Sequence, residues 1–576
     1  MSSNKLVVRK VAVLGAGVMG AQIAAHLANA KVPTVLFDLP AKEGPKNAIV
    51  EKALAALKKQ KPAPLASKTA IHYIQAANYD DDLALLGECD LVIEAVAERL
   101  DIKENLYSKV APHLGAKTIF ATNTSGLSIE TLASVFSQEL KDRFCGVHFF
   151  NPPRYMHLVE LIACKETDAS VLDNLERFLV STLGKGVVRA KDTPNFVANR
   201  IGVFSMLATM ANAEKYDLRF DVVDDLTGAR LGRPKSATFR TADVVGLDTF
   251  AHVAKTMQDN LQADPWHAHF GLPTWLTGLI EKGLLGSKTK AGIFKKEGKR
   301  IFVLDPKAGD YVPSNEKADK AVTELLKAPT WGEKLAALRA SEHPQAQFLW
   351  ACMRDVFHYI AVHAKDIAHN ARDIDFAIRW GFGWDMGPFE IWQAAGWKQV
   401  VEWINEDIAA GKTLSNAPLP AWVSDGRDGV HSDAGSLNFT TLQAEGRSDL
   451  DVYQRQYAPA NLFGESTKVL GETVFKTEAI HAFTVDNEVL VVENTNKNRA
   501  ISREVLEGIN QAIDIAEDRF KALVIWAPDA PFSVGADLKS MMPVFAAGDM
   551  AAIEAMVKLF QDTSMRLRYS QIPTVS

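Results

Sequence analysis

Short apolar runs alternate with amphipathic stretches along the first third of the chain. Strand-like runs lie at residues 6–14, 34–37, 91–94, 118–121 and 146–149. Helical periodicity lies near residues 21–30, 43–61, 101–112 and 128–135. The strand-like runs lack polar alternation, which is typical of strands buried on both faces. This order predicts an α/β domain over residues 1–191, with a doubly wound parallel sheet covered by helices on both faces.

The pattern becomes mostly helical after Asp192. We expect a helical domain over residues 192–300 and a second helical domain over residues 346–408. Between them, residues 301–345 are rich in Pro, Lys and Glu, and this composition predicts a connecting segment.

A weak internal repeat relates the two helical domains. Residues 221–248 and 373–397 each have an acidic helix start, a glycine-containing turn, a Phe and a short helix that ends on Gly. Their separation of roughly 150 residues far exceeds the ~20–50 residues of solenoid repeats, so it indicates a duplicated domain. The second copy has no strand-rich domain before it and is expected to be degenerate and structural.

The last part of the chain changes character again. Residues 409–478 are dense in Gly, Ser, Asp, Asn and Pro, which predicts a linker. Within residues 479–576, a strand at 489–493, a helix at 502–518 and a strand at 522–526 form a predicted β-α-β unit.

The composition is that of an ordinary globular protein, with 47% hydrophobic residues, 23% charged residues and a net charge of −6. It excludes collagenous and disordered chains, and the acidic balance argues against a general nucleic-acid binder. The four cysteines form no C-x-x-C pair, which favours a reducing compartment. Residues 1–10 lack the apolar core of a secretory signal, and no run approaches the ~18 apolar residues of a membrane helix. We therefore expect a cytoplasmic protein without a membrane span.

A glycine-rich turn follows the first predicted strand. Gly15, Gly17 and Gly20 form G-x-G-x-x-G between a strand and a helix, and Asp38 ends the next strand. The glycines allow a tight turn, close approach of a pyrophosphate and close helix packing, and the helix N-terminus faces the phosphate charge. An acidic residue at Asp38 bonds the adenosine ribose and repels a 2′-phosphate, which favours NAD over NADP. The turn alone leaves FAD open.

Polar residues that could take part in catalysis follow later strands of the same predicted sheet. Ser125 and His148 come after strands, where ligands of α/β sheets bind. Histidine suits the removal of a hydroxyl proton because its pKa lies near neutrality. Glu160 could fix the tautomer of His148 and stabilise its charged form. Taken singly, such residues are more often a structural His, a helix-capping Ser and a polar surface position.

Taken together, these segments resemble the L-3-hydroxyacyl-CoA dehydrogenase family. The resemblance covers residues 9–295 and includes VAVLGAGVMGAQIA, VIEAVAERLDIK, TNTSGLSI, HFFNPPRYMHLVE, KDTPNFVANR and KTKAGIF. It implies a Rossmann domain followed by duplicated all-α dehydrogenase C-terminal domains. It also implies NAD-dependent oxidation of L-3-hydroxyacyl-CoA to 3-oxoacyl-CoA in fatty acid β-oxidation.

The resemblance assigns roles to residues of this chain. His148 becomes the general base and Glu160 its partner, Ser125 bonds the substrate oxygen, and Asn199 positions the acyl group. The residues that fall where the family contacts NAD are Glu98, Lys103, Asn123, Asn151 and Lys288. Lys58 and Lys61 fall near the coenzyme A phosphates in the family, although a solvated lysine face explains them equally well.

The C-terminal residues 489–576 resemble the first part of the crotonase, or enoyl-CoA hydratase, fold. The segment ALVIWAPDAPFSVGADLKSM places Ala536 where the family forms half of an oxyanion hole with a backbone N–H. The family's second donor and two catalytic glutamates belong to segments that follow this point. We therefore expect a partial crotonase (ββα) domain without hydratase activity, interrupted within a longer protein.

Two other functions compete with this interpretation. One is a dehydrogenase of a non-CoA hydroxy acid, since the same fold serves such substrates. The other is a non-catalytic CoA-binding assembly module. The expected partner is an acyl-CoA thioester, and a homo-oligomer or a thiolase partner is left open. No metal site is expected, because His267-x-His269 and the pair of His363 and His369 lack a third ligand.

Overall fold

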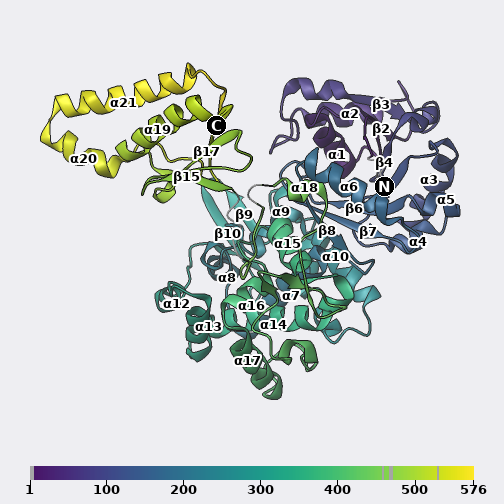
Figure 1. Ribbon diagram of the computed structural model, residues 1–576. Helices are drawn as coiled ribbons and strands as arrows, with labels where there is room; N and C mark the ends of the chain where they lie inside the picture. Colours follow the sequence, from purple (N-terminus) through teal and green to yellow (C-terminus); the bar gives the residue numbers. More distant parts are fainter. Residues whose placement is uncertain (1–5, 457–458, 466–470, 529–530) are drawn as a thin grey trace. The chain divides into compact units, whose positions relative to one another are not determined.

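The computed structural model describes residues 6–456, 459–465, 471–528 and 531–576. The chain divides into two compact units. The first comprises Met1–Arg455 and Asn461–Ser466, and the second comprises Gln456–Ala460 and Thr467–Ser576. The largest sheet of the first unit has eight strands, and the second unit has a five-stranded sheet (Figure 1).

An eight-stranded sheet opens the first unit. Its strands are β1 (Val11–Leu14), β2 (Thr34–Asp38), β3 (Ile74–Asn78), β4 (Leu91–Glu94), β5 (Ile119–Thr122), β6 (Phe144–Phe149), β7 (Leu158–Ala163) and β8 (Gly186–Ala190), in the spatial order β3-β2-β1-β4-β5-β6-β7-β8. The first six strands in space are parallel, as predicted. The pattern of the chain did not predict β3, the antiparallel pairing of β7 with β6, or β8.

Helices cover both faces of this sheet. They are α1 (Val18–Asn29), α2 (Ala48–Leu57), α3 (Leu100–Val110), α4 (Ile129–Ala133), α5 (Gln138–Lys141) and α6 (Ala169–Ser181). Val11 and Val13 point into one apolar core, while Ala12 and Leu14 point into the other. Because neighbouring residues of β1 are buried on opposite faces, the two-sided burial predicted from the apolar runs is confirmed. The helix expected over 43–61 is shorter than predicted.

Two helical copies follow the sheet. The first helical copy contains α7 (Ala198–Lys215), α8 (Phe220–Thr227), α9 (Phe239–Val245), α10 (Leu247–Asn260) and α11 (Thr274–Glu281). The second helical copy contains α14 (Pro344–Ile367), α15 (Ala371–Phe382), α16 (Pro388–Ala394) and α17 (Trp397–Ala409). The long helices α7 and α14 pack against each other near the centre of Figure 1.

Equivalent helix caps support the duplication. In the first helical copy, the Asp224 carboxylate accepts hydrogen bonds from the N–H of Phe239 at 2.7 Å and of Arg240 at 3.0 Å. In the second, Asp375 accepts from Phe389 at 2.8 Å and Glu390 at 3.1 Å. Each aspartate satisfies amides at the start of a short helix, which otherwise lack partners within it.

The duplication continues beyond the predicted second helical domain. Asp243 accepts hydrogen bonds from the N–H of Ile293 and Phe294, both at 2.8 Å. At the equivalent place in the second helical copy, Gln393 accepts from the N–H of Val430 and His431 at 2.8 and 2.9 Å. Side chains distant in sequence thus order both segments, and the second lies in the stretch whose composition predicted a linker.

A small antiparallel meander follows each of these segments. The first has β9 (Phe294–Glu297), β10 (Arg300–Asp305) and β11 (Asp310–Pro313), and the second has β12 (His431–Ser432), β13 (Gly435–Leu437) and β14 (Ala444–Glu445). The stretches predicted as a connecting segment over 301–345 and as a linker over 409–478 therefore contain ordered structure. They also hold α12 (Lys320–Leu325), α13 (Trp331–Ala340) and α18 (Asp451–Gln454).

Aromatic residues fill the second helical copy. Trp384, Phe389, Trp392 and Trp397 are all buried. The rings of Trp392 and Trp397 stack with their centroids 4.3 Å apart. Their burial makes them core residues of the second helical copy.

The second unit is a five-stranded sheet with helices. Its elements are β15 (Glu472–Lys476), β16 (Ile480–Thr484), β17 (Val489–Asn494), α19 (Arg503–Arg519), β18 (Ala522–Trp526), α20 (Leu538–Ala547), α21 (Met550–Arg568) and β19 (Thr574–Val575). The β-α-β unit predicted from the sequence is formed by β17, α19 and β18, with the two strands parallel. The apolar face of α19 covers one face of this sheet, where Val505 and Ile513 join Leu490 and Leu523 in the core.

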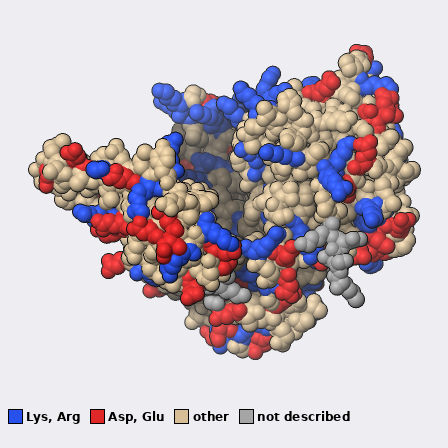
Figure 2. All heavy atoms as spheres, turned by 45° about the horizontal axis from the view of Figure 1, so that its top comes forward, with Lys and Arg blue, Asp and Glu red and all other residues tan. Residues whose placement is uncertain are grey.

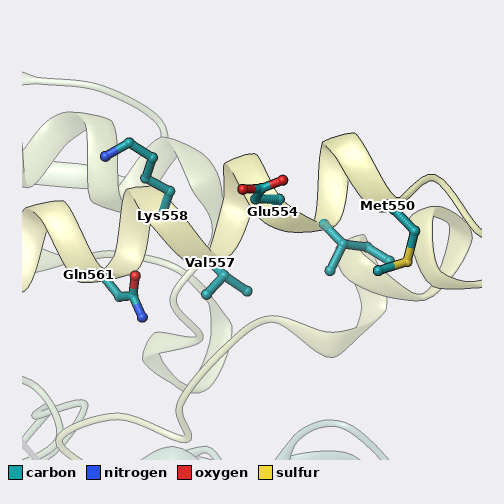
Figure 3. Close-up of a pocket in the computed structure, with 6 residues that line it drawn as sticks. Met550, Glu554, Val557, Lys558 and Gln561 are labelled. Carbon is teal, nitrogen blue, oxygen red and sulfur yellow. The ribbon is translucent and has the colours of Figure 1, made fainter.

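Helix α21 exposes apolar side chains along one side. Met550 is 71% exposed and Val557 is 46% exposed. Figure 3 shows Glu554 and Lys558 pointing to the other side of the same helix. The shallow groove drawn there is lined by α21 alone, so it is a helix surface rather than a cavity between elements.

Charged residues of both signs are interspersed over the face drawn in Figure 2, in keeping with the small net charge of −6. Among the described residues, no helix combines the length and the apolar character needed to span a membrane.

Candidate active site

The glycine-rich turn has the geometry that its spacing predicted. Gly15 has φ +102°, a conformation that favours glycine, and a Cβ there would lie 2.8 Å from the Ala95 carbonyl oxygen. A Cβ on Gly20 would lie 1.8 Å from the Gly15 carbonyl oxygen, so only glycine lets α1 come this close to the turn. A Cβ on Gly17 would meet nothing within 4 Å. Gly17 therefore faces the open space that a pyrophosphate needs at the start of α1.

Asp38 lies beside this turn, at the end of β2. Its carboxylate accepts hydrogen bonds from the N–H of Ala16 at 2.6 Å and of Leu39 at 2.7 Å. Each oxygen keeps a further lone pair, which a ribose hydroxyl could use. The acceptor oxygens of Asp38 and the open space at Gly17 fit a dinucleotide with an unmodified ribose.

A buried carboxylate that sequence reasoning missed lies at the end of β4. Glu94 accepts hydrogen bonds from Lys103 Nζ at 2.7 and 2.9 Å, from Tyr107 OH at 2.6 Å and from Thr122 Oγ1 at 2.7 Å. The Lys103 side chain is only 1% exposed. The signal for this pair in the sequence was that Glu94 and Lys103 stand nine residues apart on either side of a helix start. In the structure, Lys103 forms a buried ion pair with Glu94 behind the loop that follows β5.

Glu98 organises that loop. Its Oε1 accepts from Thr124 Oγ1 at 2.5 Å and from the N–H of Ser125 and Gly126, both at 2.9 Å. Burial by itself raises the pKa of Glu98, but the Lys103 ammonium at 3.7 Å and these hydrogen bonds outweigh it. The pKa of Glu98 consequently lies below its usual value, and the carboxylate stays charged at neutral pH.

His148 and Glu160 face each other across the β6–β7 pair. They are direct partners in the antiparallel register, and His148 Nδ1 lies 2.7 Å from Glu160 Oε2. The Glu160 side chain is fully buried. Its other oxygen accepts hydrogen bonds from the N–H of Val197 at 3.1 Å and of Ala198 at 2.8 Å, at the start of α7. The start of α7 thus holds this carboxylate oxygen in place.

Two aromatic rings restrict the imidazole. The Phe150 ring centroid lies 4.5 Å from that of His148, and the Phe196 centroid lies 5.7 Å away. His148 itself is only 5% exposed. Because Nδ1 is bonded to Glu160, Nε2 is the ring nitrogen left for proton transfer.

The other residues predicted for the catalytic side share this edge of the sheet. Asn123 follows β5, and its Oδ1 accepts from the Phe149 N–H at 2.8 Å, which ties the ends of β5 and β6 together. Ser125 lies two residues further on in the Glu98-bonded loop. Asn199 is half-buried on the first turn of α7, and Asn151 is exposed just after β6.

Three predicted lysines lie on exposed segments. Lys288 Nζ contacts both oxygens of Asp248 at 2.5 and 2.6 Å, a pairing that sequence reasoning missed. Lys58 caps the C-terminal end of α2, Lys61 lies in the segment that follows, and both are exposed.

The segment after these α2 lysines is fastened to the loop after β6. Arg154 donates to the carbonyl oxygens of Ala63 at 2.7 Å and Leu65 at 2.9 Å, and Tyr155 OH donates to Ala63 O at 2.9 Å.

Ala536 belongs to the second unit. The N–H of Ile501 donates to Gly535 O at 2.8 Å, and Ile501 O accepts from the Asp537 N–H at 2.9 Å. In such a parallel bridge, the residue between the two bonded ones turns its own N–H to the opposite side. The Ala536 N–H therefore points away from Ile501.

Comparison with known families identifies two segments. Residues 10–193 match the 3-hydroxyacyl-CoA dehydrogenase NAD binding domain, and residues 196–296 match the 3-hydroxyacyl-CoA dehydrogenase C-terminal domain. The first match contains the glycine-rich turn, Glu94 and the His148–Glu160 pair. The second contains α7 to α11.

Curated relatives match nearly the whole chain. A protein of Bacillus subtilis strain 168 named a 3-hydroxyacyl-CoA dehydrogenase is 36% identical over 588 residues, covering 99% of this chain and 73% of that protein. A protein of Rickettsia felis named a fatty acid oxidation complex trifunctional enzyme is 31% identical over 577 residues, covering 99% of this chain and 74% of that protein.

Among solved structures, 3-hydroxybutyryl-CoA dehydrogenase from Escherichia coli K12 has a TM-score of 0.55 and 22% identity. It covers 73% of this chain and 98% of its own. At this identity the likeness concerns the fold alone.

Proposed function

The chain belongs to the 3-hydroxyacyl-CoA dehydrogenase family, and from that premise we propose that His148 is the general base for the interconversion of L-3-hydroxyacyl-CoA and 3-oxoacyl-CoA. The observation that carries this proposal is the buried His148–Glu160 pair. It lies at the same sheet edge as the loop held by Glu98. NAD, bound at the glycine-rich turn, supplies the acceptor for the hydride that leaves C3.

His148 takes the hydroxyl proton of the substrate on Nε2 while the hydride leaves the carbon. Glu160 holds the other ring nitrogen and stabilises the imidazolium that forms, as the carboxylate of a catalytic triad does. In the reverse direction the same nitrogen returns the proton to the carbonyl oxygen. Ser125 bonds that oxygen, and Asn199 orients the acyl group.

The cofactor is held by residues spread over several strand ends. Gly15, Gly17 and Gly20 admit the pyrophosphate, and Asp38 bonds the ribose. Glu98, Asn123, Asn151 and Lys288 complete the cofactor side. Lys103 does not contact the cofactor in this proposal, because its ammonium is bonded to Glu94. It acts on the cofactor side through its ion pair with Glu98.

Recognition of a CoA thioester is the part of the proposal that separates it from its alternatives. The exposed Lys58 and Lys61 supply positive charge for the phosphates of coenzyme A. The names of the relatives favour a CoA substrate over a free hydroxy acid. The buried and fully bonded Glu160 favours a catalytic site over an assembly module.

The test is an assay in which the purified chain oxidises NADH with acetoacetyl-CoA as substrate. The reaction is monitored as the loss of NADH absorbance. We expect turnover with NADH well above that with NADPH, because Asp38 repels a 2′-phosphate. Free acetoacetate is the matched control, because it lacks the coenzyme A moiety. Equal rates with acetoacetate would favour the hydroxy-acid alternative, and no oxidation of either substrate would favour the assembly module.

We further propose that the second unit is part of a crotonase domain and that the Ala536 N–H donates to a thioester oxygen. Its support is the bonding of Ile501 to Gly535 and Asp537, which turns the Ala536 N–H outward. Small residues at Gly535 and Ala536 let backbone approach the thioester, as an oxyanion hole requires.

We expect the thioester C=O stretch of bound crotonyl-CoA to shift to lower wavenumber through this donor. Replacing Ala536 with Pro removes the N–H, whereas Ala536→Gly keeps it and serves as the control. The measurement is an infrared difference spectrum with a 13C-labelled thioester, comparing the two variants. Identical spectra for Ala536→Pro and Ala536→Gly would contradict this role.

A further inference from the structure

The C-terminal end of α15, in the second helical copy, packs behind the His148–Glu160 pair. Helix α15 lies against β7 and β8 of the sheet and against α7 of the first helical copy. Of these elements, β7 carries Glu160, and the first amides of α7 bond to Glu160. The family matches at 10–193 and 196–296 do not include α15.

Two aromatic rings of α15 occupy the space beside two glycines. A Cβ on Gly186 of β8 would lie 2.5 Å from Trp380 Cε3. A Cβ on Gly202 of α7 would lie 2.0 Å from Phe382 Cζ. Either glycine, if given a side chain, would displace the ring. The end of α15 is therefore fitted to β8 and α7 at close range.

Gly381 lies between these two aromatic residues and also has no room for a side chain. A Cβ there would lie 2.8 Å from Leu158 Cδ2, 3.4 Å from Ala198 Cβ and 3.7 Å from Phe150 Cε1. Hence the backbone of α15 passes close to residues of β7, of α7 and of the loop after β6 at one point, and any side chain there would meet all three.

Each of those three residues is one step from the catalytic pair. The Phe150 ring packs on the His148 ring at 4.5 Å. The Ala198 N–H donates to Glu160 at 2.8 Å. Leu158 lies two residues before Glu160 on β7. A shift of any of them moves a group that orients the imidazole or the carboxylate.

We propose that the corner formed by Trp380, Gly381 and Phe382 of the second helical copy is a positioning element for the reaction of the first unit. It acts through Phe150 and the start of α7, and it touches no reacting atom. The inference rests on the proposed role of His148. It gives the second helical copy a part in catalysis beyond filling a core.

The test introduces volume at the corner with Gly381→Val. We expect kcat for NADH oxidation with acetoacetyl-CoA to fall about 10- to 100-fold, the loss typical of a misplacement near 1 Å. The KM for NADH stays within about twofold, because the glycine-rich turn is on other elements. A second substitution, Leu158→Ala, vacates the space and restores part of kcat.

The control is Gly332→Val in α13. A Cβ on Gly332 would lie 3.2 Å from the Ala395 carbonyl oxygen, so this variant also strains the second helical copy but not at the catalytic pair. We expect its kcat to match the wild type. If Gly381→Val does not fold, Gly381→Ala adds only the Cβ, and a kcat loss of about 3- to 10-fold is expected.

The outcomes separate the inference from the proposed function. If the wild type oxidises NADH and His148→Gln does not, while a folded Gly381 variant keeps full kcat, only the inference is overturned. An equal loss of kcat in Gly332→Val also overturns it, since the effect then reflects general strain. A wild type without activity overturns the proposed function, and this inference falls with it.

Discussion

Replacing His148 with Gln lowers kcat for NADH oxidation with acetoacetyl-CoA by about 10²- to 10⁴-fold, the usual contribution of a general acid or base. Glutamine has a similar reach and keeps hydrogen-bonding capacity, but its amide cannot accept and return a proton at neutral pH. The glycine-rich turn lies on other strands, so the affinity for NADH, measured by fluorescence titration, stays unchanged.

The matched control for this change is His113→Gln. His113 is exposed on the short helix after α3, so its loss leaves kcat unaltered. Turnover of His148→Gln within threefold of the wild type would remove His148 from the mechanism.

Replacing Glu160 with Gln has the second large effect, a loss of about 10²- to 10⁴-fold in kcat. Every group that the structure bonds to Glu160 in the acting tautomer is a donor: the Val197 and Ala198 amides and the Nδ1–H of His148. The amide NH₂ of Gln must face one of these donors, which leaves a buried group without a partner. That mismatch costs about 1–3 kcal/mol of stability as well.

The measurement pairs steady-state kinetics with urea unfolding, and Glu176→Gln is the comparison. Glu176 is also a buried carboxylate, bonded to Arg189 and to Tyr453, but it lies on α6. We expect Glu176→Gln to lose stability and keep kcat. If both variants lost kcat equally, the effect of Glu160 would be one of folding rather than chemistry.

Much of the cofactor side could be predicted from the sequence because its determinants are local. The strand, the glycine-rich turn and α1 follow one another, and Asp38 comes at the end of the next strand. Gly15 and Gly20 owe their identity to backbone contacts within that short segment and at the neighbouring Ala95. Spacing along the chain is enough to recognise such a turn.

The buried residues that hold the cofactor side in place could not be predicted in the same way. Glu94 and Lys103 gave a visible spacing, but only packing buries the pair and directs it to the loop held by Glu98. Likewise, residues 429–445 have the composition of a loop, and the Gln393 side chain orders their start. Hydrogen bonds between distant segments leave no periodic trace in the sequence.

The sequence by itself determined the buried strands and the glycine-rich turn between strand and helix, because strand and helix periodicity and the glycine spacing are properties of neighbouring residues. Only the tertiary structure decided which side chains come together beside these elements. The antiparallel turn of β7 onto β6 sets His148 opposite Glu160, and the start of α7 fixes the carboxylate. It also brings Gly381, from the second helical copy, close to Leu158, Ala198 and Phe150, which adjoin that pair. These relations depend on strand order and packing, which become fixed when the whole chain buries its apolar faces.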